Sequence, residues 1–365
     1  MSIDNESDIT LVDVDTESPE SRALSGNSSR SMRTRILATL QMEKYSALWI
    51  WAGLILLFGL WVPDTFLTWS NVQIILSSQA VTAIVALGLV APLAVGAVDL
   101  AVGSAVGVTG MLAAVLMAHS GWGTVPTIVA TLVLGCCIGA VMGVLVGVVR
   151  ISSMIVTLAA SSVLGGLTLW LSDGQNVVGL TSRFLALGSG TMLGLAWPFW
   201  VMLLLCVCAW LFFDHTATGR YLHATGLGQE AARLSGVPTT RLIVLALTVS
   251  AGAASTAGLL GTARIGAGDP SFGPSYLLPA YAAVFLGSTQ VRPGFFNPWG
   301  TVISVYVLAT GVKGLQLAGA PVWIPDVFNG IALLAAVSLA VVKQRLAARL
   351  TLLRTRRLVT SRRPT

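Results

Sequence analysis

Residues 125–148 read VPTIVATLVLGCCIGAVMGVLVGV, and this stretch contains no charged side chain. A helix needs about 20 predominantly apolar residues to cross the hydrocarbon core of a bilayer, so the stretch is long enough to span it. Glycine recurs in it at intervals of four, as Gly135, Gly139, Gly143 and Gly147. That spacing puts the glycines on one helix face, where small residues allow close approach of a second helix. The sequence therefore predicts a spanning helix that packs tightly along its glycine face.

The composition of the whole chain agrees with this stretch. Of the 365 residues, 55% are hydrophobic and 10% are charged, whereas about a quarter of the residues in a soluble domain are charged. Long unbroken apolar runs favour helices over a β-barrel. We therefore expect an all-α polytopic membrane protein. The formal net charge of +6 comes from basic residues at segment ends and in the C-terminal tail, so we interpret it as a topology signal and expect no nucleic-acid partner.

Apolar run length predicts ten spans. They lie near residues 46–62, 71–91, 100–118, 125–148, 152–172, 196–213, 241–262, 276–290, 299–317 and 326–342. The second and third are expected to be joined by a tight turn through Pro92, Gly96 and Asp99. We expect the fifth to be broken at Gly165-Gly166 and the eighth to be short, because broken or half-length spans surround many translocation paths.

Composition also divides the chain into three parts. Residues 1–43 are acidic and then rich in Ser and Arg, which predicts a disordered cytoplasmic arm. Residues 44–342 form the transmembrane domain, and residues 343–365 form a basic cytoplasmic tail. With the N-terminus inside, only Arg183 and Arg264 fall clearly on the outer side, and this asymmetry supports the orientation.

One long hydrophilic insert, residues 214–241, separates the sixth and seventh spans on the side predicted to be cytoplasmic. Within it, Gln229–Leu234 favours a short helix, with Gly226 and Gly228 before it and Gly236 after it. A short helix between breakers is typical of a docking element. An ordinary solvated loop with one helical turn is the alternative.

The stretch GRYLHATGLGQEAARLSGV at 219–237 resembles the cytoplasmic coupling loop of the ribose-type permeases of bacterial ABC sugar importers. VDLAVGS at 98–104, MIVTLAASSVLGGL at 154–167 and AAVFLGST at 282–289 are similar to further segments of that family, in the same order. Residues 276–280 read YLLPA where the family often has Y-E-L-D-A. The loss of those carboxylates leaves the solute open, or places this chain in a divergent subgroup of the family.

The resemblance implies a ten-span permease of the bacterial cytoplasmic (inner) membrane, with both termini cytoplasmic. The implied partners are ABC ATPase subunits, a second permease copy or paralogue, an extracytoplasmic solute-binding protein and a small sugar-like substrate. ATP and Mg would bind the ATPase subunit, so we expect no cofactor or metal in this chain. The implied ATPase-coupling residues are Gly226, Gln229, Glu230, Ala231, Ala232, Arg233 and Gly236.

Polar residues within or beside the apolar runs are candidates for the translocation path, namely Gln79, Asp99, Thr157, Ser161 and Asn176. Asp99 is the only acid well inside the apolar region, and an intramembrane ionisable group usually marks function. It can instead cap the third span at a cytoplasmic turn, which is the interpretation we favour. The Ser and Thr hydroxyls can instead bond the preceding turn of their own helix or a neighbouring helix.

Two other classes of protein compete with an ABC permease. An ion-coupled secondary transporter shares the apolar content and the broken spans, but it usually carries several buried charges near the midplane. An intramembrane enzyme needs a nucleophile with a base, and the spans offer none. The chain also has no Gly-Lys-Ser/Thr phosphate-binding loop. We therefore predict a transport subunit without an ATPase site of its own.

Overall fold

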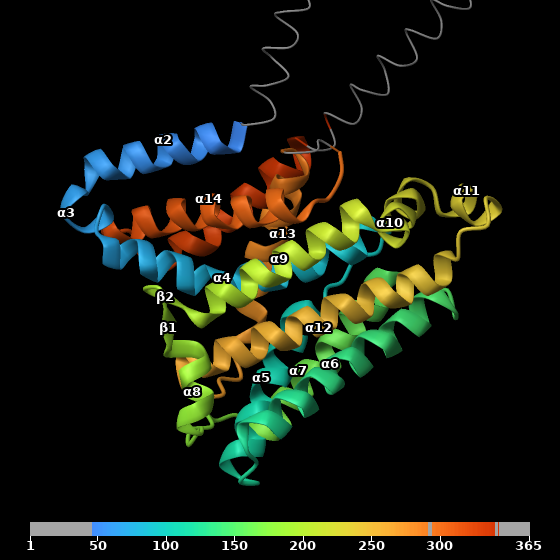
Figure 1. Ribbon diagram of the computed structural model, residues 1–365, viewed down its shortest axis with the longest axis horizontal. Coiled ribbons are helices and arrows are strands. Elements are labelled where there is room, and N and C mark those ends of the chain that lie inside the picture. The colour runs from blue at the N-terminus through green and yellow to red at the C-terminus, as the bar shows by residue number, and fades with distance from the viewer. Residues whose placement is uncertain (1–45, 291–293, 340–341, 343–365) are drawn as a thin grey trace, which may run out of the picture. The chain divides into compact units, whose positions relative to one another are not determined.

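The computed structural model describes residues 46–290, 294–339 and 342. The predicted N-terminal arm, residues 1–43, and the predicted basic tail, residues 343–365, lie outside these residues. Figure 1 shows that the described part is built almost entirely of helices.

Each of the ten predicted spans coincides with a helix. These helices are α2 (Ser46–Trp61), α4 (Trp69–Ala94), α5 (Val102–Ala118), α6 (Thr124–Gly147), α7 (Ser153–Ser172), α9 (Trp197–His215), α12 (Thr239–Ile265), α13 (Leu277–Ser288), α14 (Pro298–Leu317) and a last apolar helix, Ile324–Leu339. Among the described residues, six helices are long and apolar enough to cross a membrane: α4, α6, α7, α9, α12 and α14. The all-α class is confirmed, and the count of ten crossings stays a prediction.

The chain also has shorter elements, most of which lie at the two ends of the bundle (Figure 1). They are α3 (Pro63–Phe66), α8 (Ser182–Ser189), strands β1 (Thr191–Met192) and β2 (Leu195–Ala196), α10 (Ala217–Leu227), α11 (Gln229–Leu234) and the 3-10 helix η1 (Gly273–Tyr276). The strands pair as an antiparallel hairpin. We call the end with α8 and the hairpin the hairpin end, and the other, where α12 begins, the α11 end.

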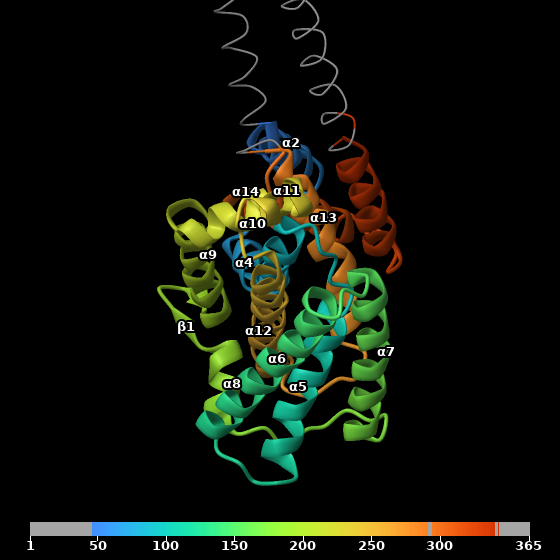
Figure 2. The same cartoon turned by 90° about the vertical axis from the view of Figure 1, so that its right-hand side faces the viewer.

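Helix α12 lies at the centre of the bundle, with α4, α5 and α6 packed around it (Figure 2). The glycine face of α6 lies against α12, as predicted. A Cβ atom on Gly139 would lie 2.6 Å from the Cα of Thr248, and one on Gly143 would lie 2.6 Å from the Cα of Val244. Neither position has room for a side chain, so the two backbones are in direct contact along this face.

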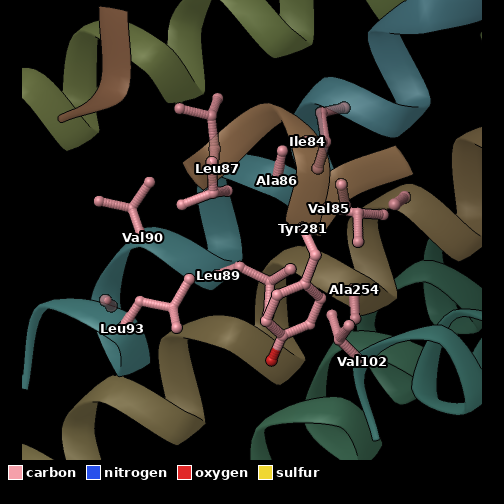
Figure 3. Packing of buried hydrophobic residues seen from close by; sticks show 14 of the residues in the cluster. Ile84, Val85, Ala86, Leu87, Leu89, Val90, Leu93, Val102, Ala254 and Tyr281 are labelled. Atoms are coloured by element: carbon pink, nitrogen blue, oxygen red, sulfur yellow. The ribbon is translucent and has the colours of Figure 1, made fainter. Parts of the chain in front are cut away.

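The second half of α4 is the other central element. Residues 80–94 of this helix are all buried, and a helix that is apolar on every side is expected in the interior. Figure 3 shows Ile84, Val85 and Leu89 of α4 in the same cluster as Ala254 of α12 and Tyr281 of α13. Neighbours therefore surround α4 on all sides.

Two expectations about helix breaks are wrong. Helix α7 runs without interruption through Gly165 and Gly166, because glycine lowers helix propensity without removing a backbone donor. Pro92 does not end α4, which continues to Ala94. The α4–α5 connection, residues 95–101, is short, as predicted, but most of it is buried, and α12 lies between α4 and α5. The eighth span is short, as predicted: α13 covers 12 residues and follows η1.

Candidate functional site

The predicted short helix of the insert is present, and α11 covers Gln229–Leu234. Helix α10 precedes it and is capped at its start by Thr216, whose hydroxyl accepts a hydrogen bond from the Gly219 N–H at 3.1 Å. After α11 the backbone of Gly236 adopts a φ of +83°, a left-handed conformation that glycine reaches without strain. Local capping at both ends therefore fixes the length of this segment.

Two charged side chains of α11 face solvent. Arg233 donates a hydrogen bond to Glu230 at 2.6 Å, and the two side chains are 48% and 72% exposed, respectively. Residues three apart lie on one face of a helix, so the pair forms within α11 itself. An exposed pair of this kind adds little stability, and both charges remain accessible to another molecule. Ala232, in contrast, is buried and anchors the helix to the bundle.

A cavity of about 620 Å³ lies beside α11. Gln229, Glu230 and Arg233 line it on one side. The opposite wall comes from the α4–α5 connection, the end of α6, the start of α7 and the start of α12. Gly226 touches the backbone carbonyl of Ala94, with no room for a Cβ atom between them. The α10–α11 segment therefore lies close to the ends of all these helices.

The α4–α5 connection is held by side chains of neighbouring helices. From α7, Ser153 accepts a hydrogen bond from the Val98 N–H at 3.1 Å, and Thr157 accepts one from the Leu100 N–H at 3.1 Å. From α13, the Tyr281 hydroxyl accepts from the Asp99 N–H at 3.0 Å and donates to the Asp99 carbonyl at 2.9 Å. These bonds replace the ladder that a helix would supply to backbone groups inside a membrane.

The carboxyl group of Asp99 joins the connection to α12. Asp99 is fully buried, and one carboxyl oxygen accepts a hydrogen bond from Ser250 at 2.6 Å while the other accepts from the Ala101 N–H at 3.0 Å. A buried polar group without such partners is costly. Ser250 lies seven residues beyond Ile243, which lines the α11 cavity, so Ser250 lies about 10 Å along α12 from that cavity.

The structure brings some of the predicted path residues together and leaves others apart. The Asp99 carboxyl group and the Thr157 hydroxyl both accept hydrogen bonds from backbone N–H groups of the α4–α5 connection. Ser161 shares a hydrogen bond of 2.8 Å with Ser104 of α5. Gln79 lies elsewhere, at a second cavity described below. Asn176 is exposed in the segment between α7 and α8. The five residues therefore do not line one continuous space.

Sequence reasoning missed the partners of Asp99. Tyr281 and Ser250 come from segments that lie 182 and 151 residues away along the chain. A tyrosine inside an apolar run was a usable signal for Tyr281, because a buried tyrosine hydroxyl usually has a hydrogen-bond partner. Ser250 gave no comparable signal, since serine is common in spanning helices.

The second cavity, of about 300 Å³, lies toward the hairpin end. Its walls come from α4, the end of α12, η1, α13, α14 and the last helix. The polar side chains on these walls include one acid, one base and several neutral groups: Gln79, Thr82, Arg264, Tyr276, Asp326 and Asn329. We call this space the polar cavity.

Comparisons with known proteins identify the family. Residues 71–337 match the family model described as "Branched-chain amino acid transport system / permease component". The ribose import permease protein RbsC of Escherichia coli (strain K12) is 34% identical over 280 residues, which cover 76% of this chain and 87% of the relative. The chain belongs to the monosaccharide ABC importer permeases. The resemblance drawn from the sequence motifs is thereby confirmed.

Other monosaccharide ABC importer permeases match over similar lengths. The D-allose transport system permease protein AlsC of Escherichia coli (strain K12) is 27% identical over 297 residues, covering 81% of this chain and 91% of the relative. The L-arabinose ABC transporter permease protein AraH of Azospirillum brasilense is 32% identical over 281 residues, covering 76% and 82%. No solved structure matches the chain. Since these permeases are named for different sugars, membership fixes a permease of sugar transport and leaves the solute open.

Proposed function

We propose that this chain is the membrane-spanning permease subunit of an importer that moves a monosaccharide, or a similar small polyhydroxylated solute, into the cytoplasm, driven by ATP hydrolysis in a separate subunit. The observation that carries the proposal is α11, a short capped helix that exposes a charged pair and borders the ends of several spanning helices. The relatives supply the sugar class.

Coupling in this proposal begins at α11. An ATPase subunit that holds the exposed Glu230 and Arg233 can shift the α10–α11 segment as a rigid body. Because Gly226 touches the Ala94 backbone without a gap, a shift of the segment also displaces the start of the α4–α5 connection. Closely packed interiors transmit such displacements instead of absorbing them.

The α4–α5 connection then passes the displacement to the interior. Asp99 is bonded to Ser250 of α12 and to Tyr281 of α13, and Thr157 bonds the same segment from α7. Movement at the α11 end is therefore transmitted to α7, α12 and α13, the helices whose side chains bond the segment around Asp99. In this role Asp99 positions the connection and does not itself touch the solute.

The proposal includes the partners that such an importer requires. ABC ATPase subunits would bind at the α11 end, which is then cytoplasmic, and a solute-binding protein would deliver the solute at the hairpin end. A second permease copy or a paralogue would complete the membrane unit. The competing function, an ion-coupled secondary transporter, usually needs several buried charges. Among the described residues, Asp99 is the only buried Asp, Glu, Lys or Arg.

Charge reversal in α11 tests the proposal. The permease is reconstituted in liposomes with its ATPase and solute-binding protein, and ATP-driven uptake of labelled D-ribose, D-allose and L-arabinose is measured. We expect Glu230→Arg to abolish uptake while the protein still inserts into the membrane, because the reversed charge repels the docking surface of the ATPase.

A charge swap distinguishes docking from local helix stability. The double variant Glu230→Arg/Arg233→Glu restores an ion pair within α11 but presents it in the opposite order. We expect the double variant to remain inactive. Recovery of uptake in it would assign the pair a merely structural role, and sugar accumulation from an ion gradient without the ATPase would establish the secondary transporter instead.

A further inference from the structure

Two connections between helices share a sequence motif. Residues 96–103 read GAVDLAVG and residues 266–273 read GAGDPSFG, so both contain Gly-Ala-x-Asp-x-x-x-Gly. The first glycine of each copy is left-handed, with φ of +79° at Gly96 and +82° at Gly266. In each copy the Asp carboxyl group accepts a hydrogen bond from the N–H two residues further on, at 3.0 Å in the first copy and 2.8 Å in the second. The two copies therefore have the same local structure.

The helices around the motif repeat with the same spacing. Gly96 and Gly266 are 170 residues apart, and this shift carries α4 and α5 onto 239–264 and 272–288. Helix α12 covers the first of these ranges, and η1 and α13 together cover the second. The packing repeats as well, because α6 packs on α12 as α14 packs on α4. Since α4 and α12 run in opposite directions (Figure 1), the two halves form an inverted repeat.

The two halves meet at the glycine that ends each motif. A Cβ atom on Gly103 would lie 3.1 Å from the carbonyl oxygen of Gly273, and one on Gly273 would overlap the carbonyl oxygen of Gly103. The backbones of α5 and η1 are therefore in direct, reciprocal contact. The first motif lies in the α4–α5 connection toward the α11 end. The second lies at the hairpin end in residues 266–272, which we call the α12–η1 connection.

The two connections differ in how they are held. Side chains of α7, α12 and α13 bond the α4–α5 connection. The same shift of 170 residues places an apolar side chain at the position matching each of these four anchors. Trp323, Val327, Ala80 and Met111 stand where the anchors are Ser153, Thr157, Ser250 and Tyr281. Ala and Val have no hydrogen-bonding group, Met has only a weak acceptor and Trp only a donor, so the α12–η1 connection lacks the anchors of its counterpart.

Backbone hydrogen bonds attach the α12–η1 connection to the segment between α7 and α8. The Val177 N–H donates to the Gly268 carbonyl at 2.9 Å, and the Gly268 N–H donates to the Val177 carbonyl at 2.8 Å. In the part of the chain that the structure describes, the side-chain hydrogen bonds of the connection stay within residues 266–275. Segments with few buried side-chain bonds open at lower free energy than the rest of a fold. The repeat is therefore mechanically asymmetric.

We propose that the α12–η1 connection is the outer gate of the permease, whereas the α4–α5 connection moves only together with the helices that anchor it. This inference rests on the proposed import function and adds the element that opens. The gate opens when the Val177–Gly268 bridge breaks and η1 leaves the backbone of α5. Gly266 is the hinge, because glycine changes its backbone angles without a steric penalty. Helix α13 stays bonded to the Asp99 backbone through Tyr281.

A disulfide across the bridge tests the gate. Val178 and Ala267 follow Val177 and Gly268 in the antiparallel register, and opposite residues in such a register lie at a Cα distance that suits a disulfide. The four native cysteines are replaced by alanine, and the permease is reconstituted with its ATPase and solute-binding protein. We expect oxidation of Val178→Cys/Ala267→Cys to lower ATP-driven uptake of labelled D-ribose, D-allose and L-arabinose about tenfold or more. Reduction restores uptake, and the single variant Val178→Cys is the matched control that oxidation leaves active.

Hydrogen exchange tests the difference between the two connections without a disulfide. Exchange into the wild-type assembly in lipid nanodiscs is measured by mass spectrometry, at rest and during ATP turnover with the three sugars. We expect exchange in residues 266–272 to become about tenfold faster during turnover. Exchange in residues 95–101, which carry the same motif, is the internal control and is expected to stay unchanged.

Each outcome has a defined meaning. Normal uptake by the fully oxidised double variant would overturn the gate, and so would a loss that reduction does not reverse. Faster exchange during turnover in both connections, or in neither, would overturn the asymmetry. Failure of the wild type to accumulate any of the three sugars with ATP would instead overturn the import function on which the gate rests.

Discussion

Removal of the Asp99 carboxyl group is expected to weaken both the fold and the coupling of the permease. In Asp99→Ala, the Ala101 N–H and the Ser250 hydroxyl lose their acceptor, and both groups are buried. A buried donor left without an acceptor costs about 1–3 kcal/mol. Ser250 can redirect its hydroxyl to a carbonyl of its own helix, so we expect a total loss of about 2–4 kcal/mol in the free energy of unfolding.

The same substitution at the surface provides the control. One carboxyl oxygen of Asp269 also accepts two hydrogen bonds, from the Ser271 N–H at 2.8 Å and from its hydroxyl at 2.7 Å, but these are exposed to solvent. Water can replace the acceptor there, so we expect Asp269→Ala to cost less than about 1 kcal/mol. The free energy of unfolding of both variants is measured by SDS titration in mixed micelles, and ATP-driven uptake is measured in liposomes.

The comparison has a clear point of failure. Equal costs for Asp99→Ala and Asp269→Ala would show that burial does not make the Asp99 contacts important. Asp99→Asn refines the test, because its amide oxygen can still accept from the Ala101 N–H and its amide nitrogen can donate to Ser250. We expect Asp99→Asn to retain most of the stability that Asp99→Ala loses.

Three further substitutions follow from the packing. Gly139→Leu is expected to prevent assembly of α6 on α12, whereas Gly165→Leu, with open space around its site, is tolerated, and the yield of monodisperse protein measures the difference. Gly226→Ala is expected to reduce ATP-driven uptake at unchanged protein level, because the added methyl group pushes α10 off the backbone carbonyl at the end of α4; wild-type uptake would refute this contact as a coupling route. Tyr281→Phe removes both hydrogen bonds to the Asp99 backbone and is expected to cost about 1–3 kcal/mol in SDS titration, with a less than additive effect when combined with Asp99→Ala.

The helices were predictable because each depends on local apolar length. A run such as residues 125–148 must become helical in a bilayer, whatever surrounds it, since its backbone groups have no other partners. The glycine spacing of α6 was informative for the same reason, because it lies on a single helix face. The breaks were less predictable, because neither Gly165-Gly166 in α7 nor Pro92 in α4 interrupts its helix. The two glycines keep their backbone N–H donors, and the helices packed around the buried Pro92 stabilise α4 at that position.

The candidate sites depended partly on local sequence motifs and partly on the packing of distant segments. The motif around Glu230 and Arg233 indicated α11 from the sequence alone, because a short helix between glycines is a local feature. The cavity beside α11 has walls from residues of five separate elements, and no local pattern indicates which helix ends will meet. Gln79 was selected as a polar residue in a span, but its neighbours Arg264, Asp326 and Asn329 become neighbours only when α4, α12 and the last helix pack together.

The sequence by itself determined that this chain is a helical membrane protein, which segments form its helices, and which family of permeases it belongs to. These properties follow from apolar length and short motifs, which operate within one segment at a time. Only the tertiary structure decided that α12 separates α4 from α5, that Asp99 binds Ser250 and Tyr281, and that the polar cavity exists. Each of these depends on contacts between distant segments, and several alternative helix arrangements satisfy the same apolar runs.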